Sequence, residues 1–169
     1  SGSENDLRHA GADDSKKLSH KRRERIREAL RPLGQSVLRV ITPAEIDAGN
    51  INQLEEQAFA SIIVETAPDH VIIDAPCNPR GIAAFEARLT RSVVALGGQI
   101  PTFTIEPKAD ARYPICGAAS IFAKVYRDEK IRDLGAVGSG YPSDPVTLAK
   151  PDSCTVELTI VRLLVGFVL

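Results

Sequence analysis

Short β-forming runs alternate with amphipathic helical patterns between residues 36 and 106, and this alternation constrains the fold more than any other feature. The β-forming runs are residues 36–41, 70–74 and 102–106. Helical patterns over residues 50–66 and 79–96 separate them, because apolar residues recur there at the spacing of one helix face. Strands connected by helices build α/β sheets, so the sequence predicts a mixed sheet flanked by helices.

Local capping signals predict where several helices begin. Ser19 is placed to cap a helix that runs through Arg31, and Pro114 opens a longer helical pattern. Thr42-Pro43-Ala44-Glu45 has the form of a capping box with proline at the first helical position. Asn50 precedes the pattern of residues 50–66, for which we expect an inner face that includes Leu54 and Ile62.

The chain has the size and composition of one globular domain. It has 169 residues, of which 43% are hydrophobic, and this is enough to bury a core. We divide it into residues 1–6, a leader or engineering remnant, residues 7–150, the α/β domain, and residues 151–169, a tail. The leader lacks the apolar segment of an export signal.

The cysteines predict a reducing, cytoplasmic setting. The 3 cysteines lie far apart, and no pair has the Cys-x-x-Cys spacing. An odd number without that spacing supports neither a disulfide framework nor a zinc site.

Basic residues gather in one stretch although the formal net charge is only −1. They are Lys16, Lys17, Lys21, Arg22, Arg23, Arg25, Arg27 and Arg31, and the acids among them are Glu24 and Glu28. Overall charge gives no general attraction to a polyanion, so binding of nucleic acid would depend on such a local patch. The alternative is an ordinary solvated helix face.

Residues 155–169 form an apolar, β-forming tail. The tail is too short and too interrupted by charge to be a membrane span, so we expect no membrane association. It is either buried in a sheet or prone to aggregation.

Two carboxylates are candidates for a metal site. Asp74 closes the apolar run 70–74, and Asp110 lies between Lys108 and Arg112, which can meet phosphate. Each also has an ordinary explanation: Asp74 as a partner for the backbone of the next turn, Asp110 in an ion pair or helix cap. Together, on adjacent elements, they suit Mg²⁺ or Mn²⁺, which prefer oxygen ligands.

Further polar residues are candidates for contacts with nucleic acid. Ser120 and Lys124 are spaced to share a helix face, and Lys124 with Arg127 can neutralise phosphate. The alternative is a solvated helix face. Tyr141, between Gly140 and Pro142, can stack on a sugar or base, or it can plug a loop into the core.

Four stretches in order resemble archaeal-type ribonuclease HII. They begin with Asp13-Asp14-Ser15-Lys16-Lys17-Leu18 and the run ending at Asp74. Lys-Ala-Asp-Ala-Arg-Tyr-Pro at 108–114, leading into Ala-Ala-Ser-Ile-Phe-Ala-Lys-Val-Tyr-Arg-Asp at 118–128, is the most specific, and Gly138 to Pro145 follows. The resemblance implies a ribonuclease H-like fold and cleavage of the RNA strand in RNA–DNA hybrids, or in duplex DNA with an embedded ribonucleotide, using Mn²⁺ or Mg²⁺.

The resemblance also implies roles for individual residues. Asp74 and Asp110 correspond to two of four metal-binding carboxylates. Asp14, Ser15 and Lys16 resemble the segment that contacts phosphate, and Tyr141 resembles the tyrosine that senses the ribonucleotide junction.

One family motif is missing from the sequence. Asp-Glu-Ala-Gly-Arg-Gly, which supplies the other two carboxylates on an early strand, does not occur. We therefore expect absent leading strands, an unpaired sheet edge, and strand addition by residues 155–169 within the chain or between chains. We expect impaired cleavage; the alternatives are a non-cleaving nucleic-acid-binding fragment and a strand-paired oligomer.

Overall fold

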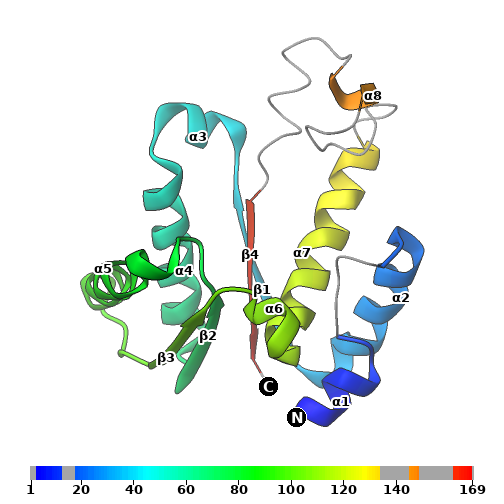
Figure 1. Cartoon of the computed structure of the whole chain (residues 1–169), viewed down its shortest axis with the longest axis horizontal. Coiled ribbons are helices and arrows are strands. Elements are labelled where there is room, and N and C mark those ends of the chain that lie inside the picture. The colour runs from blue at the N-terminus through cyan, green and yellow to red at the C-terminus, as the bar shows by residue number, and fades with distance from the viewer. Residues whose placement is uncertain (1–2, 13–17, 134–144, 149–161, 169) are drawn as a thin grey trace.

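Two groups of helices lie on either side of a central pair of strands in the computed structural model (Figure 1). The structure describes residues 3–12, 18–133, 145–148 and 162–168. Helices α4 (Ile51–Thr66) and α5 (Ile82–Ala95) lie on one side, and α7 (Pro114–Asp133) and α2 (His20–Leu30) lie on the other. This arrangement confirms the predicted α/β fold with strands flanked by helices; in place of one mixed sheet, the described strands form one antiparallel and one parallel two-stranded sheet.

Strands β2 (His70–Asp74) and β3 (Thr102–Glu106) form a parallel pair with a continuous register from His70↔Thr102 to Asp74↔Glu106. Parallel strands need a crossover connection, which the short helix η3 (Pro79–Gly81) and α5 supply. The predicted helix over residues 79–96 is thus a 3₁₀ turn followed by an α-helix. Both strands end at the same edge of the sheet, each on an acidic residue.

Helices α4 and α5 cover this pair with one apolar core. Its buried residues are Ala60, Ile63, Ile73, Phe85, Leu89, Val93 and Ile105. Asn50 caps the start of α4, as predicted, and its side chain accepts a hydrogen bond from the Asn52 N–H at 2.9 Å. Its buried face includes Ile62 but not Leu54, because α4 packs against α5 as well as against β1 and β4.

Strand β1 (Gln35–Ile41) pairs antiparallel with β4 (Arg162–Val168), which belongs to the apolar tail. The register runs from Gln35↔Val168 to Ile41↔Arg162, so this part of the tail adds a strand within its own chain. β4 also contacts α4 and α7, which places it between the two helical groups. Residues 155–161 lie outside the described residues.

The helix boundaries near β1 follow their capping signals. Helix η2 (Arg31–Leu33) leads into β1, and α3 (Pro43–Ala48) follows it. The Thr42 hydroxyl accepts from the Glu45 N–H at 3.3 Å, and the Glu45 carboxylate accepts from the Thr42 N–H at 2.7 Å. This is the predicted capping box. Another short helix, α8, spans Pro145–Leu148.

Helix α1 (Glu4–His9) begins within the stretch that the sequence suggests is a leader. Ser3 caps it through a reciprocal pair of hydrogen bonds with Asp6, and these bonds lower the pKa of Asp6. Leu7 is fully buried. Residues 3–6 are therefore part of a capped helix that contributes to the core.

A second apolar core joins α1, α2 and α7. Its buried residues are Leu7, Ala12, Ile26, Leu30, Ala118, Ile121 and Val125. The backbone of Ala12 lies so close to α7 that a Cβ on Gly117 would be 1.9 Å from the Ala12 carbonyl oxygen. Only glycine allows this approach.

Among the described residues, no helix has the length and apolar character needed to cross a bilayer.

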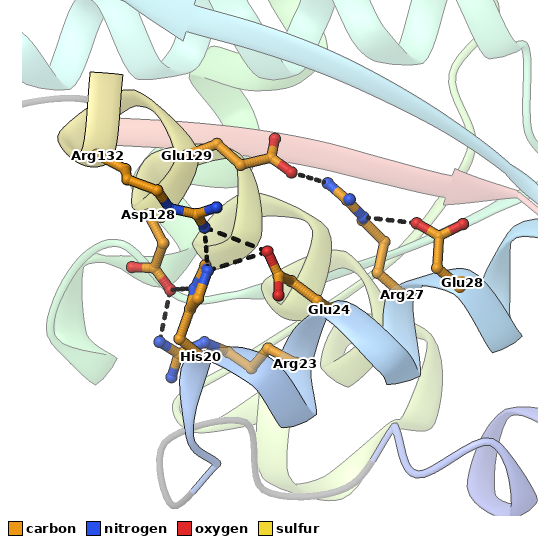
Figure 2. A network of polar contacts seen from close by, with 8 residues as sticks. All are labelled: His20, Arg23, Glu24, Arg27, Glu28, Asp128, Glu129 and Arg132. Carbon is orange, nitrogen blue, oxygen red and sulfur yellow. Dashed lines mark hydrogen bonds and ion pairs between the residues drawn. The ribbon is translucent and has the colours of Figure 1, made fainter. Parts of the chain in front are cut away.

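A network of charged side chains fastens α2 to α7 (Figure 2). Its members are His20, Arg23, Glu24, Arg27, Glu28, Asp128, Glu129 and Arg132. Asp128 Oδ2 lies 2.5 Å from Arg23 Nη2 and 3.0 Å from His20 Nδ1. Arg27 Nη1 donates to Glu129 at 2.7 Å, and a hydrogen bond from Arg132 contributes most to lowering the pKa of Glu24.

Replacing Gly117 with alanine is expected to destabilise the fold. The added Cβ overlaps backbone, which cannot move aside as a side chain can, so we expect a loss of about 1–3 kcal/mol in the free energy of unfolding. Alanine's higher helix propensity, worth about 1 kcal/mol, offsets only part of this loss. Urea unfolding measures the change.

Gly81→Ala is the control, because a Cβ there would meet the Cys77 sulfur at 3.4 Å, the Cys77 Cβ at 3.5 Å and Asn78 Oδ1 at 3.7 Å, which are ordinary contacts. Equal unfolding midpoints for the two alanine variants would contradict the close approach of Ala12 to α7.

Asp128→Asn is expected to cost about 1.5–3 kcal/mol of stability, because Asp128 receives charge-assisted hydrogen bonds and is only 17% exposed. Glu28→Gln is the control. Glu28 is 55% exposed, and an exposed pair of this kind contributes about 0–1 kcal/mol. Thermal unfolding measures the loss of stability in both variants. Equal losses would show that Asp128 forms only a solvated charge pair and does not hold α2 against α7.

Candidate metal and nucleic-acid site

Asp74 lies at the carboxyl end of β2, where its carboxylate connects the strand to the short helix that follows β3. Asp74 Oδ1 accepts a hydrogen bond from the Ala109 N–H at 3.1 Å. Ala109 is the first residue of the short helix α6 (Ala109–Arg112). The bond occupies one of the two carboxylate oxygens and holds the start of α6 against the end of β2.

Lys108 makes the chain reversal between β3 and α6. Its backbone has φ 61° and ψ 34°, the left-handed region that residues with a Cβ rarely adopt. Such a conformation costs on the order of 1–3 kcal/mol and is maintained by the surrounding structure. It directs the Ala109 N–H toward Asp74 and places Asp110 in the first turn of α6. The Lys108 side chain is exposed at this corner.

Cys116, in the first turns of α7, links the two candidate carboxylates. Its thiol donates to the Ile72 carbonyl oxygen at 3.3 Å. Burial and, to a smaller extent, the negative charges of Asp74 and Asp110 together raise the pKa of Cys116 to about 12. Both carboxylates therefore lie close enough to one thiol to act on it, so the fold gathers them around the start of α7.

Glu106 is a second acid at this edge of the sheet, opposite Asp74 in the register. Its carboxylate accepts from the Tyr113 hydroxyl at 3.1 Å and forms an ion pair with Arg112. The hydrogen bond to Glu106 raises the pKa of Tyr113. Arg112, a candidate for phosphate, is thus engaged in a local ion pair. The sequence signal for Glu106 was its place at the end of a strand, as for Asp74.

The candidates on α7 lie along one stripe. Ser120, Lys124 and Arg127 follow Cys116 at spacings that keep them within about 80° around the helix. Lys124 Nζ donates to the Ser120 hydroxyl at 3.1 Å, which confirms that they share a helix face. The stripe begins at Cys116, which lies beside Asp74 and Asp110, and it extends away from these carboxylates along α7.

The remaining candidates, Asp14, Ser15, Lys16 and Tyr141, lie outside the described residues. The chain just before Asp14 is placed, however. The Cβ position at Gly117 that nearly coincides with the Ala12 carbonyl oxygen is also 3.3 Å from the Asp110 carbonyl oxygen. Ala12 therefore lies beside the helix that carries Asp110.

Asp74 and Asp110 fit a hard divalent cation as two of its ligands. Carboxylate oxygens are the ligands that Mg²⁺ prefers, and Mg²⁺ is commonly held by one or two carboxylates with water and substrate phosphate completing the shell. In the described part of the chain, no group of three or more His, Cys, Asp or Glu residues is arranged to hold a metal. The described residues thus offer a partial site.

Comparison with known proteins gives a consistent family match. A family model described as Ribonuclease HII matches residues 1–163. Ribonuclease HII of Methanocorpusculum labreanum is 39% identical over 150 residues, which are 85% of this chain and 68% of that protein. The Hyperthermus butylicus enzyme is 42% identical over 150 residues, 82% of this chain and 58% of that protein. The chain therefore spans about three fifths to two thirds of these relatives.

Solved structures match the fold as well. One is the PCNA:RNase HII complex from Archaeoglobus fulgidus, with a TM-score of 0.75 and 34% identity over 86% of this chain and 71% of that chain. Another is ribonuclease H2 from Pyrococcus horikoshii OT3, with a TM-score of 0.70 and 35% identity over 83% of this chain and 68% of that chain.

Cys116 is expected to resist alkylation near neutral pH. Its pKa of about 12, against an ordinary 9.0, leaves about 10³-fold less thiolate than in the unfolded chain. We expect iodoacetamide at pH 8 to modify Cys116 at least about 100-fold more slowly in the folded chain than in urea. Peptide mass spectrometry identifies the modified residue. Similar rates in both conditions would contradict the burial of this thiol.

Proposed function

The chain belongs to the ribonuclease HII family, and from this we propose that it carries part of the active site of a metal-dependent endonuclease that hydrolyses the RNA strand of RNA–DNA hybrids. The observation that supports this most is the hydrogen bond from the Ala109 N–H to Asp74, which holds the helical turn that carries Asp110 against the end of β2, at the edge of the sheet where β2 and β3 end. Carboxyl ends of strands are where sites in open α/β sheets commonly form.

In this proposal Asp74 and Asp110 hold Mn²⁺ or Mg²⁺. A bound divalent ion would lower the pKa of a water nucleophile and stabilise charge on phosphate oxygens. The chain's own contribution is orientation. The Ala109 N–H fixes one oxygen of Asp74, and the reversal at Lys108 sets Asp110 beside it.

We assign the substrate contacts to Lys108, Ser120, Lys124 and Arg127. They begin at the carboxylates and continue along α7, as a phosphate backbone leaving the cleavage point would require. Asp14, Ser15, Lys16 and Tyr141 join them by resemblance to the family. The substrate is an RNA–DNA hybrid or duplex DNA with an embedded ribonucleotide, met in the cytoplasm, where free cysteines such as Cys77 and Cys116 persist.

We further propose that these 169 residues cleave weakly, because the sequence supplies two of the four carboxylates that the family resemblance implies. The second candidate function is binding of hybrid without cleavage, which the partial metal site among the described residues favours. Association of copies through residues 155–169 is less favoured, because β4 already pairs with β1 within the chain.

The test is cleavage of a labelled DNA duplex that contains one ribonucleotide, with Mn²⁺ and with Mg²⁺, together with binding of the same duplex. We expect binding, and cleavage that is slow or absent. Any cleavage by the wild-type chain should disappear in Asp110→Asn, because that change removes a metal ligand. Asp133→Asn, an exposed acid of α7, is the control and should retain it.

Cleavage that persists in Asp110→Asn would contradict the assignment of Asp110 to the metal. Failure of the wild-type chain to bind the duplex at any salt concentration would contradict the proposed function as a whole.

A further inference from the structure

The cations of α2 separate onto two faces of the helix. With about 100° per residue, Arg23 and Arg27 lie on the side that faces α7, where Asp128 and Glu129 pair with them. Lys21, Arg22 and Arg25 lie within another arc of about 100°. Ile26 and Leu30, which are buried in the core, lie between these two faces. The basic stretch is therefore partly structural and partly exposed.

The exposed face carries positive charge that is not neutralised nearby. Lys21, Arg22 and Arg25 are all exposed, and in the described part of the chain no acidic side chain pairs with them. The acids of α2 are engaged elsewhere: Glu24 with His20 and Arg132, and Glu28 with Arg27 and Arg31. These three cations are thus available to an external anion.

The same three side chains line a groove between α2 and the end of α1. Its volume is about 650 Å³, and its other lining residues are Ala10, Ser19, Ile26 and Ala29. The three cations supply its charge, and none of its lining residues in the described part of the chain is acidic.

We propose that this basic groove, formed by Lys21, Arg22 and Arg25, binds the phosphate backbone of the nucleic-acid duplex at a distance from the metal carboxylates. The proposal rests on the proposed function, which supplies the polyanion. Lys21 and Arg25 are separated by about 6 Å along the helix axis, so they meet neighbouring charges of an extended polymer better than one small anion. Lys and Arg contacts to phosphate position a duplex without reading its sequence.

The groove is connected to the candidate active site by a short path. Ala10 lines the groove, and Ala12, two residues later, lies against Gly117 beside Asp110. Figure 1 shows α2 on the far side of α7 from β2 and β3, so the groove lies across α7 from the strands that lead to the carboxylates. A duplex that reaches from the carboxylates to the groove gains affinity and a fixed orientation.

The test is binding of a fluorescent RNA–DNA hybrid by anisotropy, in EDTA and over a range of KCl concentrations. The triple variant K21Q/R22Q/R25Q is compared with the wild-type chain. We expect weaker binding and a slope of log Kd against log salt that is smaller by about 2–3, because each neutralised phosphate contributes about 0.9 in a B-form duplex. Thermal unfolding should be unchanged, since the three side chains are exposed.

The matched control is R80Q/R88Q/R91Q, which removes three exposed arginines from η3 and α5 and changes net charge by the same amount. It should bind like the wild-type chain. Three results would contradict the proposed role of the groove. They are a wild-type salt slope in K21Q/R22Q/R25Q, equal losses of affinity in both triple variants, and absence of hybrid binding by the wild-type chain. Displacement of the hybrid by polyglutamate as effectively as by unlabelled hybrid would also contradict it.

Cleavage is measured separately with Mn²⁺. Because the binding assay contains no metal, a wild-type chain that binds but does not cut still tests the groove. A loss of cleavage without a loss of binding therefore reports on the metal site, and a smaller salt slope in K21Q/R22Q/R25Q reports on the groove.

Discussion

The parallel register of β2 and β3 is the constraint on which the candidate site depends. It brings Asp74 level with Glu106, so the chain leaves β3 directly beside the carboxylate that ends β2. The left-handed turn at Lys108 then directs the Ala109 N–H to Asp74, and Asp110 follows in the next turn. A shift of one residue in this pairing would turn Asp74 to the other face of the sheet and separate the two carboxylates.

Helix α7 extends this local arrangement to the rest of the molecule. Its first turns hold Cys116 against β2, its glycine admits the backbone of Ala12, and its last turns pair with α2 through Asp128 and Glu129. The ion pairs that hold α2 against α7 engage some of the cations of α2, and its other cations remain exposed. Stability and the proposed nucleic-acid binding therefore depend on the same basic stretch but on different side chains, which helical spacing separates.

The sequence predicted what depends on neighbouring residues and missed what depends on distant ones. The capping box at Thr42 and the helix start at Asn50 are confirmed, because their partners lie within a turn. The pairing of Arg23 with Asp128 joins residues about a hundred positions apart, and no local pattern indicates it. The buried face of α4 was only partly predicted, since α4 is covered from two directions. The same holds for the candidate site: local sequence patterns indicated Asp74 and Asp110, whereas no local pattern indicated Cys116. The roles assigned to them stay predictions.

Binding of Mn²⁺ to the hybrid-bound chain tests the joint role of Asp74 and Asp110 most directly. Electron paramagnetic resonance measures free Mn²⁺ during a titration, with the hybrid alone as the reference. We expect the wild-type chain and Asp133→Asn to bind Mn²⁺ with equal affinity, and Asp74→Asn and Asp110→Asn each to bind it more weakly. Unchanged affinity in both Asp74→Asn and Asp110→Asn would contradict a metal site at the end of β2 and β3.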